Sequence, residues 1–332
     1  MPNGFGYVTK GVGGLYTVRL LPHDAADIPK PYEPQPLDGQ TVSARARNFR
    51  RGDGLLVGDF AEVTYDASSY TVRGGVATPA PDGAGIAIVR VLPRRSALIR
   101  PPMANLDLLF VTVAAAAPAP DLETVDKLLC IAVHNKIAPV VVVNKCDLDP
   151  AAAERIAAIY RAAGFPVFCT VGATGEGVPA LADYVAEAVP RRLAAFAGAS
   201  GVGKSTLLGR LFPSLEFATG DISRRISRGK NTTRHVELCP LSNAPDSGYL
   251  ADTPGFTMLD FDRFDFFGLD DLPAAFPEFS PYIGSCRYSD CTHTKEDDCA
   301  VRAAVCAGKI PPSRHETYCS LYAVLKKKPR WK

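Results

Sequence analysis

Apolar and polar positions are spaced differently in three stretches of the chain. Residues 1–97 contain short alternating runs interrupted by glycine, such as GYVTKGVGGLYTVRL at 6–20 and GIAIVRVLP at 85–93, which is typical of β-strands. A small five-stranded barrel fits this pattern, and the oligonucleotide-binding (OB) barrel is a common design of that size. Another small barrel or open sheet with no nucleic-acid role is the alternative, because a fold alone does not settle function.

The middle stretch, residues 98–275, alternates strand-like apolar runs with helix-like ones such as LETVDKLLCIAVHN at 122–135. Residues 276–332 are mixed and rich in cysteine. We therefore predict three domains, namely an OB-type β-barrel, an α/β domain and a small C-terminal module. Nearly continuous apolar runs predict strands buried in a parallel sheet. These runs include LDLLFVTVAA (106–115), PVVVVNK (139–145), FPVFCTV (165–171), RLAAFAGAS (192–200), VELCPL (236–241) and GYLADTPG (248–255).

A glycine-rich loop follows the strand-like run RLAAFA and opens the helix-like run TLLGRLF. It fits the pattern G-x-x-x-x-G-K-[ST], in which backbone N–H groups surround an anion and a helix N-terminus adds a favourable dipole. Lys204 would reach the outer phosphates of a nucleotide, and the Ser205 hydroxyl would bind Mg²⁺. The candidate nucleotide-binding residues of this phosphate loop are Gly198, Ala199, Ser200, Gly201, Val202, Gly203, Lys204, Ser205 and Thr206.

Two further segments have the residues expected to bind Mg²⁺ and the terminal phosphate next to such a loop. Asp252-Thr-Pro-Gly255 follows the run GYLA; the Asp would hold Mg²⁺ through water, and the Gly255 N–H would follow the terminal phosphate. A β-turn is the alternative interpretation of this segment. The polar segment RGKNTTRH at 228–235 is a candidate switch loop, in which Thr233, or Thr232, would complete the Mg²⁺ shell.

The stretch VVVNKCDL at 141–148 places Asn-Lys-x-Asp after an apolar strand. Guanine presents two N–H donors side by side, and a carboxylate such as that of Asp147 accepts both. Asn144 and Lys145 would support the loop and cover the base, with Cys146 beside them. A pocket built on such bonds rejects the wrong base by about 10⁴-fold. NKCD alone would indicate a surface turn, but a phosphate loop in the same predicted sheet favours guanine recognition.

The order of these motifs along the chain is unusual, because the base motif precedes the phosphate loop. Between them, TVGATGEGV at 170–178 has the glycine-rich character of the loop that closes over guanine, with Val171 and Gly172 as its candidate binding residues. This order is expected of a circularly permuted GTPase domain. Permutation is physically permissible because domain termini tend to be exposed and near one another.

Cysteines are concentrated near the C-terminus. The stretch CRYSDCTHTKEDDC has the spacing C-x4-C-x-H-x5-C, and three thiolates with one imidazole form a closed tetrahedral set for one structural Zn²⁺. Reduced, unligated thiols are the alternative, and that description suits Cys306 and Cys319 better. The candidate metal ligands are Cys286, Cys291, His293 and Cys299.

Composition and charge indicate a folded globular protein but do not identify its binding partner. With 47% hydrophobic and 22% charged residues, the 332-residue chain has the composition of folded globular protein. Its formal net charge of +2 is too small to indicate a nucleic-acid partner by itself. Basic clusters such as RARNFRR at 45–51 and KKKPRWK at 326–332 are more suggestive, although solvated loops are the ordinary interpretation. No secretory signal or membrane-spanning run is visible, so we expect a cytoplasmic protein with no membrane partner.

In chain order, NKCD, GASGVGKST, RGKNTTRH, DTPG and the C-x4-C-x-H-x5-C module resemble the RsgA family, circularly permuted GTPases that assist late maturation of the small ribosomal subunit. The resemblance covers nearly the whole chain. It implies an oligonucleotide-binding barrel, hydrolysis of GTP to GDP stimulated by the small subunit, and a zinc module that helps to dock on ribosomal RNA. We expect a monomer.

The chain departs from the family pattern at two sites, and from many other GTPases at a third. Relatives usually carry Ser-Ala where this chain has Val171-Gly172, and a glycine N–H can still serve the base. Relatives often carry His just before the Thr pair, where this chain has Asn231, and Phe256 stands where many GTPases carry glutamine. We therefore expect slow intrinsic hydrolysis, with Asn231 at most orienting the attacking water. An RNA-binding factor that merely holds GTP is the second hypothesis. The third, a P-loop ATPase or kinase, is disfavoured by NKCD.

Overall fold

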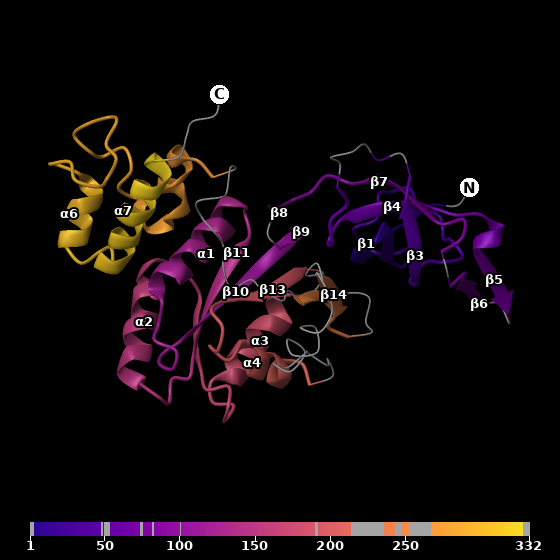
Figure 1. The fold of residues 1–332 in the computed structure, drawn as a ribbon, viewed down its shortest axis with the longest axis horizontal. Coiled ribbons are helices and arrows are strands. Elements are labelled where there is room, and N and C mark those ends of the chain that lie inside the picture. The colour runs from indigo at the N-terminus through magenta and orange to yellow at the C-terminus, as the bar shows by residue number, and fades with distance from the viewer. Residues whose placement is uncertain are drawn as a thin grey trace. The chain divides into compact units, whose positions relative to one another are not determined.

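The computed structural model describes residues 3–47, 49, 54–73, 76–81, 83–99, 101–189, 192–213, 236–242, 248–252 and 267–327. The chain forms two compact units (Figure 1). One unit contains residues 1–107, 186–195 and 221–255, and the other contains residues 108–185, 196–220 and 256–332. The division falls within strand β13 (Leu193–Ala197), so each unit draws on several parts of the chain.

The first unit is built around a closed barrel. Its five strands follow one another in the order β1-β2-β3-β7-β4, and β4 pairs back with β1. β3 and β7 run parallel, whereas the other neighbouring strands run antiparallel. Apolar side chains such as those of Val8, Val42 and Ile88 form its buried core. The predicted barrel is therefore confirmed. Its strands are β1 (Asn3–Val12), β2 (Leu15–Leu20), β3 (Thr41–Ala46), β4 (Phe60–Thr64) and β7 (Ala87–Val91).

Shorter elements complete this unit. They are the 3-10 turn η1 (Ala67–Ser69), the hairpin of β5 (Tyr70–Arg73) and β6 (Val76–Pro79), the hairpin of β8 (Ala97–Ile99) and β9 (Pro102–Ala104), β14 (Glu237–Pro240) and β15 (Tyr249–Asp252). β15 is parallel to β13, as expected, but the parallel arrangement expected for VELCPL is wrong, because β14 runs antiparallel to β15. Glu237 and Pro240 are exposed, so β14 does not have the two buried faces that parallel strands require.

The second unit contains the parallel strands β10 (Leu106–Ala114), β11 (Ala138–Asn144) and β12 (Val167–Thr170). Its first helices are α1 (Leu122–His134), α2 (Pro150–Ala162), α3 (Val178–Ala188) and α4 (Lys204–Leu211). Asp121 and Asp149 accept hydrogen bonds from the first turns of α1 and α2, and so fix where these helices begin. The loops that follow β11 and β12 lie at the same edge, because parallel strands share their carboxyl ends.

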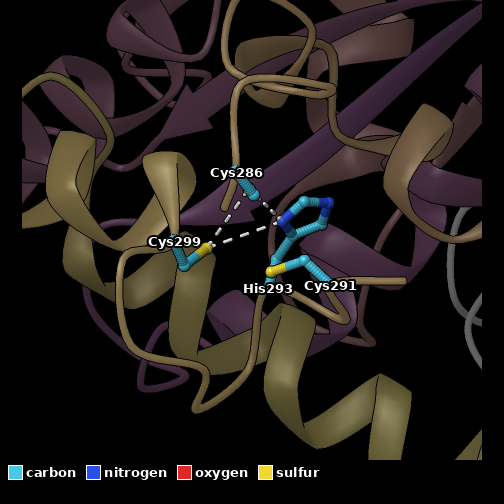
Figure 2. A group of neighbouring side chains, drawn as sticks. All are labelled: Cys286, Cys291, His293 and Cys299. Carbon is cyan, nitrogen blue, oxygen red and sulfur yellow. Dashed lines mark hydrogen bonds between the residues drawn. The ribbon is translucent and has the colours of Figure 1, made fainter. Parts of the chain in front are cut away.

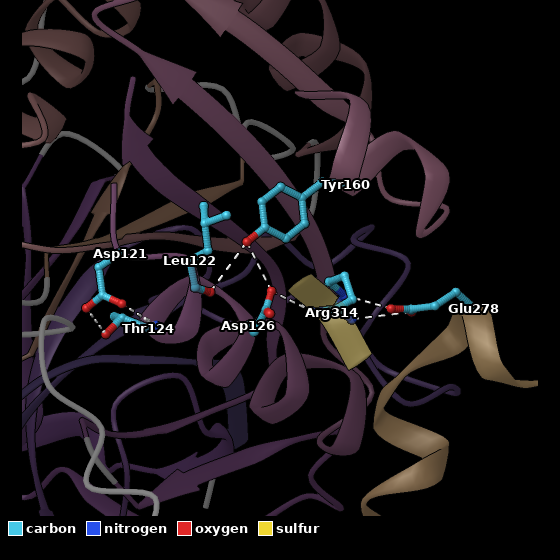
Figure 3. Close-up of polar contacts among 7 residues, drawn as sticks. All are labelled: Asp121, Leu122, Thr124, Asp126, Tyr160, Glu278 and Arg314. Atoms are coloured by element: carbon cyan, nitrogen blue, oxygen red, sulfur yellow. Dashed lines mark hydrogen bonds and ion pairs between the residues drawn. The ribbon is translucent and has the colours of Figure 1, made fainter. Parts of the chain in front are cut away.

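The C-terminal part of the second unit packs on α1 through helix α7. Arg314 of α7 is fully buried, and its guanidinium donates to Asp126 at 2.7 Å and to Glu278 at 2.6 Å (Figure 3). Tyr160 of α2 donates its hydroxyl to Asp126 at 3.0 Å. This buried ion triad holds α7 against α1 and α2. The elements of this part are η3 (Leu269–Asp271), η4 (Pro273–Ala275), η5 (Pro277–Phe279), α6 (Ala300–Cys306) and α7 (Pro312–Lys326).

Candidate functional site

The predicted phosphate loop lies between a fully buried strand and a helix. β13 ends at Ala197, and Gly198 follows with a φ of 140°. A Cβ at Gly198 would lie 2.1 Å from the carbonyl oxygen of Thr112, so only glycine fits where the loop leaves the sheet. Helix α4 then begins at Lys204, with Gly203 as its N-cap residue. The glycine-rich loop therefore leads directly into a helix N-terminus, the arrangement that favours anion binding.

Lys204 folds back over this loop. Its ammonium group donates to the carbonyl oxygens of Gly198 and Ala199, both at 2.8 Å. Burial lowers the pKa of Lys204. Ser205 and Thr206 are exposed on the first turn of α4, whereas the side chain of Val202, within the loop, is buried. An anion held by the loop would meet the Lys204 ammonium and the Ser205 hydroxyl together.

The buried side chain of Asn144 joins three loops. Its Nδ2 donates to the carbonyl oxygen of Val202 in the phosphate loop at 2.8 Å. Its Oδ1 accepts hydrogen bonds from Gly172 N at 2.9 Å and from the Thr170 hydroxyl at 3.1 Å. A Cβ at Gly203 would lie 2.3 Å from Asn144 Nδ2, so this approach requires a glycine. The base motif, the closing loop and the phosphate loop are thus brought together by one amide.

The rest of the NKCD motif forms a turn after β11. Lys145 has a φ of 59°, and its ammonium donates to the carbonyl oxygens of Gly201, at 2.7 Å, and Ala117. Cys146 N donates to the Thr170 carbonyl oxygen at 3.2 Å. Asp147 is exposed at the turn, so its carboxylate is accessible to a ligand.

The predicted closing loop is held by a residue that the sequence did not indicate. Arg210 of α4 donates through Nε to the Gly172 carbonyl oxygen at 2.5 Å and through Nη2 to that of Ala173. Val171 is buried, and its N–H donates to the backbone carbonyl oxygen of Glu176 at 2.9 Å. The Gly172 N–H, which we expected to serve the base, instead donates to Asn144. An arginine in the last turn of a helix carries no motif that would have identified Arg210.

The candidate residues of the switch segments are only partly described. Asp252 is the last residue of β15, and it follows Ala251, the parallel partner of Ala195 in β13. The remaining candidates lie outside the described residues, namely Asn231, Thr233 and Gly255 with the neighbouring Thr232, His235 and Phe256.

The predicted metal ligands converge in one cluster (Figure 2). Cys286, Cys291, His293 and Cys299 offer ligand atoms that all lie within 4.8 Å of one another. His293 Nδ1 is 3.5 Å from Cys286 Sγ and 3.6 Å from Cys299 Sγ, and these two sulfurs are 3.9 Å apart. In a tetrahedral zinc site, the usual bond lengths place sulfur and nitrogen about 3.6 Å apart and two sulfurs about 3.8 Å apart. The cluster therefore fits a tetrahedral metal ion.

Groups around the cluster fix its loop. His315 of α7 lies 2.8 Å through Nε2 from the His293 carbonyl oxygen, and the Tyr318 hydroxyl donates to the Thr292 carbonyl oxygen at 2.9 Å. Glu296 accepts backbone N–H bonds within the loop, including one from Thr294 at 3.1 Å. Burial lowers the pKa of His293, which favours the neutral imidazole that metals bind. α7 thus contacts the metal cluster and, through Arg314, helix α1.

Comparisons with known proteins agree with this arrangement. The family described as RsgA GTPase matches residues 91–262. A protein of Caldanaerobacter subterraneus subsp. tengcongensis, named small ribosomal subunit biogenesis GTPase RsgA, is 35% identical over 330 residues, which cover 98% of this chain and 97% of that protein.

Two solved structures share the fold over almost the whole chain. YjeQ from Thermotoga maritima is 28% identical, with a TM-score of 0.74 over 98% of this chain and 100% of that one. YloQ, described as a circularly permuted GTPase, is 27% identical, with a TM-score of 0.69 over 99% of this chain and 97% of that one. Here too the base motif precedes the phosphate loop, and the chain belongs to the RsgA GTPase family.

Proposed function

We propose that this chain is a GTPase that binds the small ribosomal subunit, assists its late maturation and hydrolyses GTP to GDP. The observation that carries the proposal is the Asn144 side chain, which joins the NKCD, phosphate and closing loops. One nucleotide can therefore be held at its base and at its phosphates. The ribosomal partner is suggested by the relatives' name, and a cytoplasmic location follows from that partner. Among the helices of the described residues, none is long and apolar enough to cross a membrane.

Base recognition is assigned to Asp147, whose exposed carboxylate accepts the two N–H donors of guanine. Lys145 covers the base and is held to the phosphate loop through Gly201. Gly172 shapes the closing loop, since its N–H and carbonyl are both occupied within the protein. Adenine presents a different edge to Asp147 and leaves the carboxylate without its two donors, so discrimination follows from an unpaired polar group.

Hydrolysis is assigned mainly to positioning and electrostatics. The Lys204 ammonium lies over the phosphate loop, where it would meet the outer phosphates. The role proposed for the Gly255 N–H is to follow the terminal phosphate. Mg²⁺, when bound, neutralises charge on the phosphates, and Ser205, Thr233 and Asp252 are the residues that would hold it. The role proposed for Asn231 is at most to orient the attacking water through its side-chain amide. Its amide is no base, so the intrinsic rate is slow and a partner orders the missing group.

GTP hydrolysis with and without small ribosomal subunits tests the proposal. We expect slow turnover by the protein alone and stimulation of about 10-fold or more by the subunit, within the range of partner-supplied groups. Large ribosomal subunits serve as the matched control and should give no such stimulation. GTP binding with equally slow turnover in all three samples would support the alternative of an assembly factor that holds GTP as a ligand.

Replacing Asn231 with alanine tests how water is oriented. Stimulated turnover is expected to fall about 10-fold or more, because an oriented hydrogen bond to the attacking water is lost. The matched variant is His235→Ala, which removes the imidazole nearest in sequence. A fall only in the His235 variant would move the role to histidine. Full stimulated activity in both variants would assign the orientation of water to the ribosome or to backbone groups.

We also propose that the Cys286–Cys299 cluster holds one structural zinc ion. The separations among its ligand atoms support this, and three thiolates with one imidazole leave no open coordination position. The four ligands lie on one loop that has little regular structure, so the metal would contribute to the folding of this loop.

Replacing Cys291 with alanine is expected to reduce bound zinc from about one ion per chain to a small fraction. Association with small subunits should fall while GDP affinity stays unchanged, because the nucleotide loops do not include this cluster. Cys306→Ala removes an exposed thiol and is the matched control, expected to keep its zinc. Metal analysis that finds no zinc in the wild-type protein would contradict the assignment.

We further propose a functional division into residues 1–97, 98–275 and 276–332, acting as a monomer. The barrel strands support the first part and the metal ligands support the last. Arg45 and Arg47 are exposed on the barrel and line a pocket of this unit, where they can contact ribosomal RNA phosphates.

A further inference from the structure

Two cysteines lie at the base of the guanine-reading turn. Cys146 is the third residue of NKCD, and Cys169 belongs to β12, where it is the parallel partner of Val143. Cys146 N donates to the carbonyl oxygen of Thr170, next to Cys169, at 3.2 Å. Cys146 Sγ lies 3.3 Å from the Val143 carbonyl oxygen. The second contact places the Cys146 thiol against Val143, the strand partner of Cys169, and the first ties the Cys146 backbone to the residue after Cys169.

The surroundings of Cys169 favour its thiolate. The side chain of Cys146 is its neighbour and favours the charged form, and Arg161 Nη2 of α2 lies 3.9 Å from the Cys169 sulfur. These groups lower the pKa of Cys169 to about 7, although burial and Glu154, the ion-pair partner of Arg161, oppose the shift. Both cysteines are partly exposed. A low-pKa, accessible thiol beside a second thiol is the arrangement found in redox-sensing sites.

The other cysteines of the second unit lack this combination. Cys130 is completely buried, and burial raises its pKa. Cys286, Cys291 and Cys299 belong to the candidate metal cluster, and Cys306 is exposed on α6. Cys319 of α7 is partly exposed, but burial raises its pKa.

We propose that Cys146 and Cys169 are a thiol pair that a peroxide oxidises to a disulfide, and that this bond weakens guanine-nucleotide binding. The Cys169 thiolate attacks one oxygen of hydrogen peroxide, the O–O bond breaks, and a sulfenic acid and water result after proton uptake. The Cys146 sulfur then attacks the sulfenic sulfur. A second water leaves and the S–S bond forms, so peroxide is reduced by the two electrons that the thiols lose.

The effect on the nucleotide rests on the proposed function. Cys169 is held in β12 by its pairing with β11, so the turn carrying Cys146 must move when the sulfurs close to bonding distance. Cys146 lies between Lys145, which is tied to the phosphate loop, and Asp147, which reads the base. We expect a displacement of about 1 Å at a binding group to lower nucleotide affinity on the order of 10²-fold. The disulfide would therefore disturb both the contact of Lys145 with the phosphate loop and the recognition of the base by Asp147.

The test uses purified, zinc-loaded protein treated with hydrogen peroxide. We expect non-reducing peptide mass spectrometry to find a Cys146–Cys169 cross-link. Affinity for a fluorescent GDP analogue should fall about 10- to 100-fold and return with dithiothreitol. Cys169→Ser should bind GDP like the reduced wild type and keep that affinity after peroxide. Cys306→Ser is the matched control and should respond like the wild type.

Three results would overturn the inference. The first is oxidation of Cys306 with no Cys146–Cys169 cross-link. The second is a cross-linked wild type that keeps its GDP affinity. The third is an equal loss of affinity in Cys169→Ser, or a loss that follows zinc release rather than the cross-link. Failure of the reduced wild type to bind GDP would instead reject the proposed function, and the cross-link measurement would still decide whether the thiol pair exists.

Discussion

Replacing Asp147 with asparagine is expected to weaken GDP and GTP binding by about 10²- to 10⁴-fold. Guanine points two N–H donors at this position, and an amide meets one of them with a donor of its own. Xanthine carries a carbonyl where guanine has its 2-amino group, so it offers one donor and one acceptor to the amide. The variant should therefore gain affinity for xanthosine diphosphate. Competition against a fluorescent GDP analogue measures both changes.

The neighbouring residue Asp149 provides a matched control. Its carboxylate accepts the Ala152 N–H at 2.8 Å and caps α2, and asparagine is an equally good capping residue. Asp149→Asn repeats the same chemical change two residues along and should leave GDP affinity within about twofold of wild type. Wild-type GDP affinity in Asp147→Asn would show that the base is read elsewhere. An equal loss in both variants would point to general damage of the loop.

Replacing Arg314 with methionine is expected to lower the opening free energy of α7 by about 3–5 kcal/mol. The change leaves Asp126 and Glu278 buried without their cation. Burial opposes the charge of Arg314, but these two carboxylates outweigh it and keep the pKa of the guanidinium above its ordinary value. Burial likewise raises the pKa of Asp126, and hydrogen bonds from Arg314 and Tyr160 limit that rise. Hydrogen–deuterium exchange of Pro312–Lys326 measures the effect locally.

A surface ion pair on the same helix as Asp126 is the matched control. Lys127 pairs with Glu123 at 2.8 Å, and both side chains are partly exposed, so Lys127→Met should cost less than about 1 kcal/mol. Arg314→Lys should lie between methionine and wild type, because a point charge cannot bond both carboxylates as a fork does. If Arg314→Met protects α7 from hydrogen exchange as well as Lys127→Met does, the ion triad contributes little to the stability of α7.

Much of the site could be predicted from the sequence because its chemistry requires short, contiguous motifs. The phosphate loop needs glycines at fixed positions, and Gly198 and Gly203 both lie where a side chain would collide with neighbouring groups. NKCD and the Cys286–Cys299 cluster are equally local. Helices α1 and α2 and the strand β11 between them followed from hydrophobic patterning, because each helix buries one face and β11 is buried over most of its length.

Contacts between distant residues could not be predicted in this way. Arg314 belongs to no motif, and its partners Asp126 and Glu278 belong to other elements. Arg210 and the closing loop are likewise unrelated in sequence. β14 was assigned the wrong direction, because an apolar run does not specify which strand it pairs with.

The sequence by itself determined which chemical groups this protein has and the order in which they occur, because motif spacing and hydrophobic period are properties of a continuous segment. Only the tertiary structure decided that one amide, Asn144, joins three loops, and that Cys146 contacts Val143, the strand partner of Cys169. The physical reason is that strand pairing brings together residues that no local pattern relates, and both contacts depend on the register of β11 against β12.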